Sequence, residues 1–388
     1  MVYLHWIAGT ILALAWFSRI VEAALGMPKI ADVSRPEWDR QPSVHARVSI
    51  VVPARNEESD IEDALSRLLQ LEYDDYEVIV VDDRSTDRTG EIMERVAASP
   101  AAHGCLKVIH ISELPSGWMG KVHAMWVAAQ QATGDWLLFT DADVLFKPDV
   151  LRRALAYAES ERADHMVVFP RMIMKRPGER MMIAFFQTLF TFGHRPWRVA
   201  DPKTRDHMGV GAFNLVRRST YDAVGTYRAL RMEVLDDMKL GKVIKNAGFR
   251  QRNVFGEDLI SIHWAKGAMG VVDNLTKNFF AVLSFQWWRT VASVCGLLFL
   301  NLGPFLGVLL AHGWERVPYA IALGSMFLIY LGMSFKSSIP PYYFFLHPIS
   351  TVMFGYTLVR SMWLTLRNDG VTWRGTKYPL EELRKGIV

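Results

Sequence analysis

The chain of 388 residues contains only two cysteines, Cys105 and Cys295, and they lie far apart in the sequence. Two such cysteines cannot build a disulfide framework or a cysteine-based metal site. The second lies inside an apolar run. We therefore expect the polar part of the protein to work in a reducing compartment.

The sequence also has little excess charge of either sign. Its formal net charge is only +4, far from the basic footprint of a nucleic-acid-binding protein, so no nucleic acid is expected as a partner. Hydrophobic residues make up 51% of the chain, and the charged residues gather in the middle and leave both ends apolar. This pattern predicts a membrane protein with one polar domain.

Long apolar runs mark both ends. Residues 3–25 can cross a bilayer if Arg19 reaches the interface, which predicts a transmembrane anchor over 1–26. The alternative is a signal peptide cleaved near Ala23, although no basic residues precede the run. Three further runs predict C-terminal transmembrane segments over residues 291–366, namely 291–311, 317–335 and 342–364.

Charge next to the spans predicts their orientation. The stretch after the first span is rich in Lys and Arg, so we expect a multi-pass protein of the inner (cytoplasmic) membrane with its polar domain in the cytosol. Four spans would then place the basic tail, residues 367–388, outside, where its charge is disfavoured. A re-entrant or interfacial stretch around Pro340, Pro341 and Pro348 would remove the conflict, and the sequence leaves both readings open.

The segment before the second run, residues 270–290, mixes basic and aromatic side chains. Lys277 and Arg289 lie among phenylalanines and tryptophans. This mixture is typical of a helix in the lipid headgroup region. A helix packed in a protein core is the alternative.

Residues 45–264 alternate between strand and helix patterns. The runs RVSIVVPA, YEVIVVDD, LKVIHIS and DWLLFTDAD are apolar and end in polar residues, with helical patterns between the first of them. They predict an α/β fold with a mostly parallel sheet flanked by helices. Ligands of such sheets bind beyond the carboxyl ends of the strands. Polar clusters follow three strands there, at Pro53–Glu57, Asp82–Asp87 and Asp141–Asp143.

Two of these clusters contain paired carboxylates. Asp141 and Asp143 flank one residue, a spacing that suits Mg²⁺ or Mn²⁺ together with diphosphate oxygens; a solvated turn or a helix cap is the competing explanation. Asp82 and Asp83 end a strand, where a carboxylate can accept hydrogen bonds from a nucleobase or a ribose. Capping of the following helix can explain Asp87, but it does not require the two consecutive acids Asp82 and Asp83.

A third acidic pair, Asp236 and Asp237, lies near the start of a helix predicted over 233–248. One carboxylate can act as a general base toward an acceptor hydroxyl. Acidic residues also stabilise helix N-termini. The residues alone leave the two roles equally supported.

Five segments occur in a characteristic order: PARNEE, VVDDRSTDRT, GKVHAMWVAAQQATGDWLLFTDADV, GVGAFNLVRRSTYDAVGTY and LDDMKLG. Together they resemble family 2 glycosyltransferases with the GT-A fold, over about residues 47–264. The apolar flanks and QWWR at 286–289 resemble the lipid-glycosylating members, such as ceramide glucosyltransferases and the hopanoid- and carotenoid-associated enzymes. The segment VTWRGTKY resembles the last two.

The resemblance implies roles for individual residues. Asp237 would be the base beside Asp236, which stands where the family has Glu, and Asp143 would be the main metal ligand with Asp141. Lys121 would contact the nucleobase or the diphosphate of the donor. The residues implied in donor nucleotide binding are Pro53, Ala54, Asn56, Glu57, Asp82, Asp83, Lys121 and Asp141.

A further motif departs from the family. The Q-x-x-R-W signature has Gln286 and Arg289 here, but Thr290 replaces the tryptophan. Gln286, Arg289 and Gly211 are candidates for a donor or acceptor loop. Anchoring of Trp287 and Trp288 in the membrane interface is the alternative for the motif.

These observations predict an inverting, metal-dependent transfer of a hexose from a UDP- or GDP-sugar to a hydroxyl or carboxyl group of a membrane lipid, of polyisoprenoid, hopanoid, carotenoid or ceramide-like type. The competing enzymes are a processive polysaccharide synthase, for which the C-terminal spans look too few, and a polyprenyl-phosphate sugar synthase. A nucleotidyltransferase would need a Gly-rich loop that PARNEES lacks. A non-catalytic nucleotide-binding membrane scaffold is the alternative outside enzymes, and it has no need for both a metal site and a base.

Overall fold

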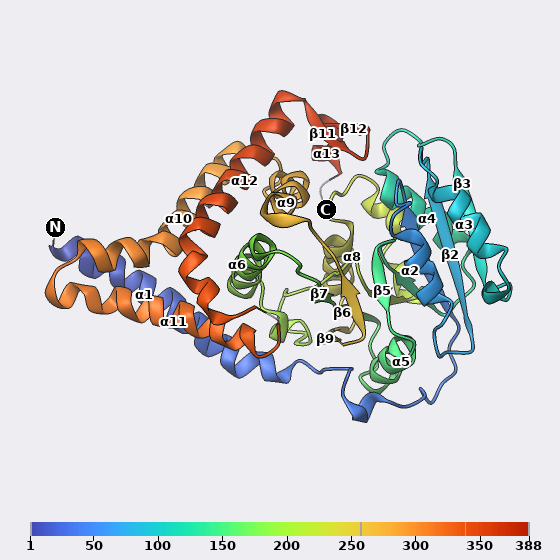
Figure 1. The fold of residues 1–388 in the computed structure, drawn as a ribbon, viewed down its shortest axis with the longest axis horizontal. Helices are drawn as coiled ribbons and strands as arrows, with labels where there is room; N and C mark the ends of the chain where they lie inside the picture. The colour runs from blue at the N-terminus through green and yellow to red at the C-terminus, as the bar shows by residue number, and fades with distance from the viewer. Residues whose placement is uncertain (1, 257, 338, 387–388) are drawn as a thin grey trace. The chain divides into compact units, whose positions relative to one another are not determined.

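The computed structural model describes residues 2–256, 258–337 and 339–386, and Figure 1 labels their elements. Contacts divide the chain into two units. We call Met1–Lys29, Met174–Trp197 and Trp264–Val371 the helical unit, and Ile30–Ile173, Arg198–His263 and Thr372–Val388 the sheet unit. The division departs from the predicted linear order at two places, because residues 174–197 group with the helices and most of the tail groups with the sheet.

The sheet unit contains a seven-stranded sheet in the order β3-β2-β1-β4-β8-β6-β9. Strand β8 runs antiparallel to both neighbours, and the other pairs are parallel. The predicted mostly parallel sheet is therefore confirmed. Its strands are β1 (Val48–Ala54), β2 (Tyr76–Asp83), β3 (Leu106–Ile111), β4 (Trp136–Phe139), β6 (His165–Phe169), β8 (Asn214–Arg217) and β9 (Gln251–Phe255).

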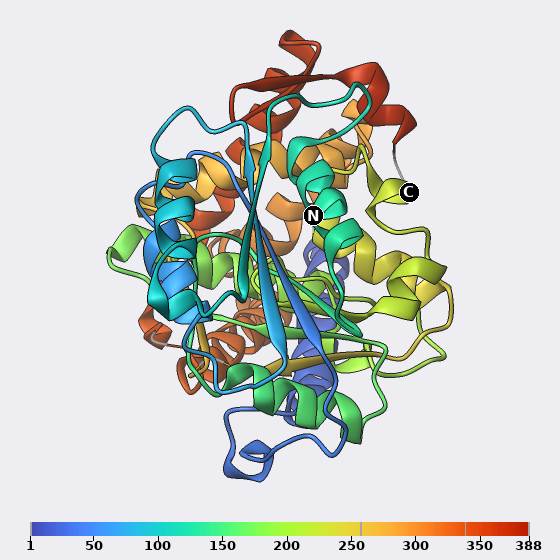
Figure 2. The ribbon, with the colours of Figure 1, turned by 90° about the vertical axis from the view of Figure 1, so that its right-hand side faces the viewer.

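Helices cover both faces of this sheet. The chain moves the same way from β1 to β2 to β3, so right-handed crossovers put α2 (Ile61–Leu68) and α3 (Thr89–Ala97) on one face. The return to β4 puts α4 (Gly120–Gln131) on the other face, and Figure 2 shows this arrangement. The remaining helices of the unit are α5 (Val150–Ser160), α7 (Arg218–Ala223) and α8 (Asp236–Asn246), and a small second sheet joins β5 (Val144–Phe146), β10 (Ile260–Ile262) and β7 (Arg171–Met172).

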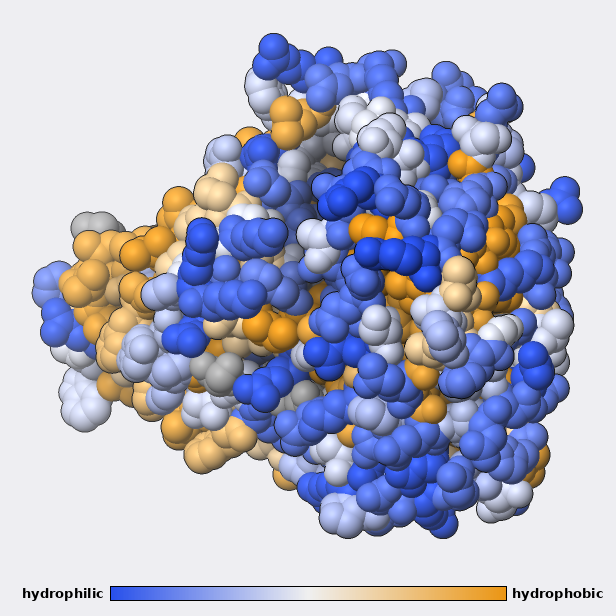
Figure 3. Space-filling model, turned by 45° about the vertical axis from the view of Figure 1, so that its right-hand side comes forward, coloured by the Kyte–Doolittle hydropathy of each residue, from blue (hydrophilic) through white to orange (hydrophobic). Residues whose placement is uncertain are grey.

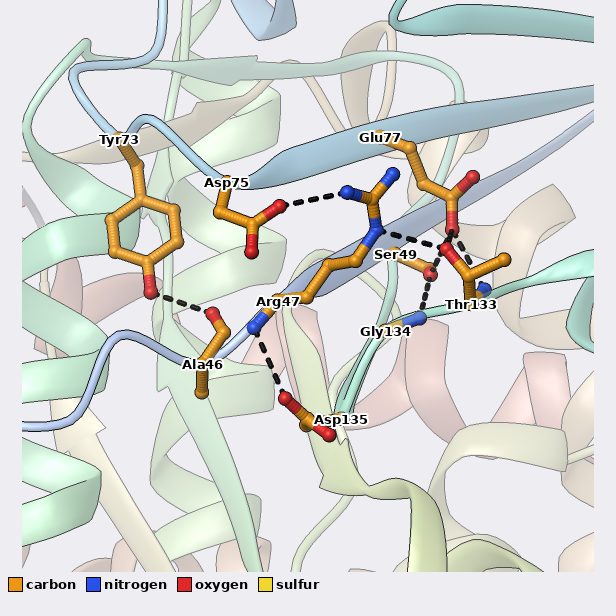
Figure 4. A network of polar contacts seen from close by, with 9 residues as sticks. All are labelled: Ala46, Arg47, Ser49, Tyr73, Asp75, Glu77, Thr133, Gly134 and Asp135. Carbon is orange, nitrogen blue, oxygen red and sulfur yellow. Dashed lines mark hydrogen bonds and ion pairs between the residues drawn. The ribbon is translucent and has the colours of Figure 1, made fainter.

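Polar contacts fasten the amino ends of the central strands (Figure 4). The Glu77 carboxylate accepts hydrogen bonds from the Ser49 hydroxyl at 2.6 Å and from the Thr133 backbone N–H at 2.7 Å. The Arg47 guanidinium joins Thr133 to Asp75, at 2.8 Å from each side-chain oxygen. The opposite, carboxyl ends of the strands are thereby left for ligands.

The chain ends in a hairpin and a short helix. Strands β11 (Gly370–Trp373) and β12 (Thr376–Pro379) are followed by α13 (Leu380–Lys385). Leu380 and Leu383 are buried in the sheet unit, and a side chain at Gly386 would collide with Met232. The segment predicted as a basic tail is therefore packed structure over much of its length.

The described part of the helical unit contains six long helices, α1 (Val2–Gly26), α6 (Pro177–Gly193), α9 (Gly267–Val282), α10 (Trp287–Leu310), α11 (Arg316–Ser334) and α12 (His347–Arg367). Three segments are long and apolar enough to cross a membrane, namely Tyr3–Lys29, Trp287–Leu310 and Gly313–Ser334. Many of their large apolar side chains are exposed, and Figure 3 shows apolar surface drawn in orange. These features indicate a membrane-associated protein.

The fourth predicted run, 342–364, is not among the helices of the described chain that are apolar enough to span. It forms the 3-10 turn Pro341–Leu346 and then α12, whose buried face carries several polar residues. His347 is fully buried and lies 3.0 Å from both the Asn301 amide oxygen on α10 and the Tyr330 hydroxyl on α11. The polar face that ties α12 to its neighbours lowers its apolarity.

The single helix predicted over 270–290 is wrong in one respect. Helix α9 ends at Val282, and Ser284 and Phe285 have φ angles of 56° and 55° before α10 begins at Trp287. Left-handed residues cannot continue a right-handed helix. Val271, Val272, Leu275 and Phe280 of α9 are buried, so this helix packs inside its unit on one side.

Candidate functional site

The polar clusters after β1, β2 and β4 lie at the carboxyl edge of the sheet. Pro53 and Ala54 are the buried end of β1, and Ala54 pairs in register with Asp82 of β2. The first residues of α4 and α8 add Lys121 and Asp236 to the same unit. The contacts described below show which of the residues singled out in the sequence lie together.

Lys121 holds the acidic groups together. Its Nζ lies 2.7 Å from Asp141 Oδ1 and 3.4 Å from Asp236 Oδ2. Burial opposes the charge of Lys121, but Asp141, followed by Asp236 and Asp237, outweighs it and holds the lysine pKa above its usual range. One ammonium group therefore interacts electrostatically with three carboxylates.

Two carboxyl groups of this site, Asp236 and Asp143, have raised pKa values. Burial, opposed by Lys121 and reinforced by Asp237, raises the pKa of Asp236 to about 6. Burial and the charges of Asp141 and Glu57 raise the pKa of Asp143 to about 7. A cation arriving beside Asp143 would relieve this repulsion.

Two glycines let a loop approach these acids closely. A side chain at Gly211 would come within 2.5 Å of Asp141 Oδ2, and one at Gly209 within 1.8 Å of the Asp237 carbonyl oxygen. The Asp141 N–H donates to the Gly211 carbonyl at 3.0 Å. Asp237 itself is half-buried at the start of α8.

A buried neutral network supports the same loop. Gln251 of β9 accepts from the Met208 N–H at 2.8 Å and donates to the Gly241 carbonyl at 3.1 Å. His165 of β6 accepts from the Gln251 amide at 2.7 Å, and burial lowers its pKa to about 4. Its other ring nitrogen contacts Asn214.

The residues at Asp143 fit a divalent cation in chemistry. The described residues contain no group of three or more His, Cys, Asp or Glu side chains placed to hold a metal. Asp141 and Asp143 nevertheless supply carboxylate oxygens, and burial, followed by the charges of Asp141 and Glu57, raises the pKa of Asp143. Mg²⁺ typically takes one or two protein carboxylates and completes its shell with water and phosphate oxygens, so two carboxylates suffice.

Asp82 and Asp83, at the end of β2, have different partners. Neighbouring strand residues face opposite sides of a sheet. Asp83 is buried and is held by Arg84, whose Nε and Nη2 lie 2.7 and 3.0 Å from its oxygens. Asp82 instead accepts from the Ser85 N–H at 3.1 Å and lies 3.0 Å from His110 Nδ1.

The loop after β1 is locked onto the loop after β2. Asn56 has a left-handed φ of 55°, and its side-chain oxygen accepts from the Thr86 N–H at 2.8 Å. Its own N–H donates to the Ser85 hydroxyl at 3.0 Å, and the Glu57 N–H donates to Thr89 at 2.8 Å. These contacts fix the backbone around both predicted nucleotide-binding residues.

The C-terminal segment contacts these loops, which the sequence reasoning missed. We call Thr372–Gly386 the C-terminal strap. Arg374 pairs with the Glu57 carboxylate and donates to the Arg55 carbonyl at 2.7 Å. The Gly120 N–H donates to the Tyr378 hydroxyl at 3.0 Å. The resemblance of VTWRGTKY to related enzymes was the one sequence signal for this segment.

Gln286 and Arg289 belong to the helical unit, at the start of α10. Arg289 donates to the Ser284 hydroxyl at 3.1 Å and lies over the Trp288 ring at 5.3 Å. Trp287 and Trp288 are exposed. A role for this motif in a donor or acceptor loop stays a prediction, as does interfacial anchoring.

Comparison with known proteins identifies the domain. Residues 49–238 match the family described as Glycosyl transferase family 2. This domain belongs to glycosyltransferase family 2. A 4,4′-diaponeurosporenoate glycosyltransferase of Staphylococcus aureus (strain bovine RF122 / ET3-1) is 23% identical over 349 residues, which cover 87% of this chain and 90% of the relative. The enzyme of the same name from Staphylococcus haemolyticus (strain JCSC1435) is 25% identical over 60% of each chain.

A solved structure gives the same fold for this glycosyltransferase. A mannosyltransferase from Pyrobaculum calidifontis, in complex with GDP-Man and Mn²⁺, superimposes with a TM-score of 0.53 at 19% identity. The superposition covers 94% of this chain and 99% of that chain. The predicted GT-A type architecture is therefore confirmed.

Proposed function

We propose that this glycosyltransferase moves a hexose, with inversion at the anomeric carbon, from a UDP- or GDP-sugar to a membrane lipid, and that it depends on a divalent ion. The observation that carries the proposal is the cluster in which Lys121 holds Asp141 and Asp236 at the carboxyl edge of the sheet, with Asp237 beside it. Fixed positive and negative groups of this kind suit a reaction that builds charge on a diphosphate.

The chemistry needs one base and no covalent intermediate. The acceptor oxygen attacks the anomeric carbon, the bond from that carbon to the diphosphate oxygen breaks, and Asp237 takes the hydroxyl proton. Lys121 orients Asp236 and Asp141 around the reacting groups. A carboxyl acceptor arrives already ionised at neutral pH, and it would not need the base.

Asp143 and Asp141 would hold Mg²⁺ or Mn²⁺, which supplies positive charge for the leaving diphosphate when it is bound. The Mn²⁺ in the similar mannosyltransferase structure supports the use of a divalent ion. On the donor side, Pro53, Ala54, Asn56, Glu57 and Asp83 would line the nucleoside. Asp82 would act indirectly, because its carboxylate already contacts His110 and Ser85.

An apolar polyisoprenoid is the acceptor class that we favour. The relatives named as 4,4′-diaponeurosporenoate glycosyltransferases resemble most of this chain. The exposed apolar helices would keep the enzyme at the membrane where such a lipid resides.

We place the sheet unit in the cytosol. If Tyr3–Lys29, Trp287–Leu310 and Gly313–Ser334 each cross once, residues 30–286 and those after Ser334 lie on one side. The strap contacts the sheet unit, and so it has to lie on that side. Three spans therefore remove the conflict that four spans created, and positive charge puts both segments inside.

The test is an assay of the full chain purified in detergent, with UDP- and GDP-sugars, Mn²⁺ or Mg²⁺ and a total lipid extract. We expect one donor to give an extractable glycolipid whose formation stops with a chelator and with Asp143→Ala. With a hydroxyl acceptor it should also stop with Asp237→Ala. Asp222→Ala, an exposed acid on α7, is the matched control and should retain activity. Nucleotide binding without transfer to any lipid would favour the scaffold instead.

A further inference from the structure

We propose that the C-terminal strap, Thr372–Gly386, forms a wall of the donor nucleotide site, with Arg374 and Tyr378 as positioning residues. This inference rests on the proposed function, because it assigns the strap to the same nucleotide. The strap and its contacts belong to the sheet unit. The strap and the segments that it contacts are separated by more than 250 residues along the chain.

The hairpin tip is shaped to present Arg374. Arg374 and Gly375 have φ angles of 47° and 78°, which makes them the two central residues of a type I′ turn between β11 and β12. A charged residue in this left-handed position places its side chain at the tip. There the guanidinium pairs with Glu57 and donates to the Arg55 carbonyl, so it fixes the loop that follows β1.

The second strand of the hairpin supports the loop after β2. The Thr376 hydroxyl accepts from Arg55 at 2.9 Å and from Arg84 at 3.4 Å. Arg84 in turn holds Asp83 through two nitrogens. Thr376 thus links both nucleoside-binding loops through one side chain.

Tyr378 extends the wall to α4. Its hydroxyl is buried and accepts from the Gly120 N–H, one residue before Lys121. A side chain at Gly120 would come within 2.4 Å of Asp83 Oδ2 and 3.3 Å of the Tyr378 hydroxyl. The strap, Asp83 and the start of α4 therefore meet at one glycine.

A buried group at this end still has hydrogen-bonding capacity. His123 of α4 is 7% exposed, and its Nδ1 has no hydrogen-bond partner among the described residues. Burial lowers its pKa, while the nearby charges of Asp83 and Arg84 also act on it. His123 thus adds an unused hydrogen-bonding atom to the helix that also carries Gly120 and Lys121, close enough to Asp83 and Arg84 for their charges to act on it.

The strap is also anchored independently of these polar contacts. Leu380 and Leu383 are 5% and 1% exposed, and Gly386 packs on Met232. Loss of one hydroxyl or guanidinium should therefore leave the strap folded. This allows its role in binding to be separated from its role in folding.

The experiment is titration calorimetry of UDP and GDP with Mn²⁺ on the full chain in detergent. We expect Tyr378→Phe and Arg374→Ala each to raise the Kd of the nucleotide about tenfold. Arg374→Lys should recover part of the lost affinity. In turnover, the donor KM should rise while kcat changes less than twofold. Lys385→Ala, whose exposed partner is Glu381, is the matched control in the strap.

The possible results separate the two proposals. If the unmodified enzyme binds neither nucleotide, or Asp83→Asn leaves binding unchanged, the proposed donor site fails. If Asp83→Asn weakens binding while Tyr378→Phe and Arg374→Ala do not, the donor site stands and the wall is overturned. A change in kcat alone for the strap variants would also overturn it.

Discussion

The two ends of the candidate site treat their carboxylates differently. At the nucleoside end, Glu57, Asp82 and Asp83 each have a basic partner of their own, which are Arg374, His110 and Arg84 respectively. At the reacting end, Lys121 pairs with both Asp141 and Asp236, and burial together with the charges of Asp141 and Glu57 raises the pKa of Asp143 to about 7. At the nucleoside end, basic side chains of the protein neutralise the carboxylates, whereas the reacting end suits a further cation that would arrive with the substrate.

The largest effect should come from removing the proposed base at the reacting end. We expect Asp237→Asn to lower kcat about 10² to 10⁴-fold with a hydroxyl acceptor, because general-base catalysis contributes about that much, and to leave nucleotide affinity within twofold. Single-turnover transfer and calorimetry measure the two quantities. Asp222→Asn should match the unmodified enzyme, and retained turnover in Asp237→Asn would move the base elsewhere.

Next in size is the loss of the shared lysine. Lys121→Met removes the cation that half-buried Asp141 and buried Asp236 share, so the free energy of unfolding should fall by about 3 kcal/mol. Denaturant titration in detergent measures it. Adding Asp236→Asn to Lys121→Met should restore part of the loss, since less buried charge remains unpaired; a strictly additive double variant would show that the three groups are not coupled.

The neutral network behind the reacting end gives a smaller, pH-dependent effect. The pKa of buried His165 is lowered to about 4, so the folded state resists a proton that the unfolded state accepts below about pH 6.5. Stability should therefore be unaffected above pH 6.5 and fall by about 1.4 kcal/mol per pH unit from there toward pH 4. His165→Gln should flatten this slope, whereas exposed His45→Gln should not; parallel slopes would refute the assignment.

The smallest effect belongs to the exposed pairing at the nucleoside end. Hydrogen bonds to Glu94 and then Asp82 raise the pKa of half-exposed His110. Because its folded pKa is raised, this contact stabilises the protein below about pH 6.5 and stops doing so as pH rises through that pKa. Glu94→Gln should cost only a few tenths of a kcal/mol at pH 6, after solvent screening, and nothing at pH 8.5. Denaturant titrations at both pH values measure the difference.

The parts of the fold that follow local patterns could be predicted from the sequence. Strands β1 and β2 are continuous apolar runs that end in Pro53–Glu57 and Asp82–Asp83, and α8 begins at the predicted acidic pair. These features depend on neighbours a few residues away. The rule for parallel strand ends predicts one shared edge for the clusters after β1, β2 and β4, whereas only the family resemblance singles out Lys121.

Other parts depend on distant contacts and could not be predicted. Nothing local tells that Arg374 meets Glu57, or that Asp82 and Asp83 have different partners. The helix break at Ser284 and Phe285 carries no glycine or proline signal within it. Similarly, the sequence gives the run that forms α12 the length of a membrane span, but the contacts of buried His347 with Asn301 and Tyr330 become apparent only in the structure.

The position of the strap has a consequence for biosynthesis. Tyr378 contacts Gly120 across 258 residues, and Thr376 contacts Arg55 across 321. At about 5–20 residues per second, a ribosome needs roughly 13–50 s to reach the strap after Gly120 has been made. By then the segments that form α10 and α11 have already been synthesised. If the strap completes the nucleotide site as proposed, donor turnover should begin only after both of these helices have been synthesised.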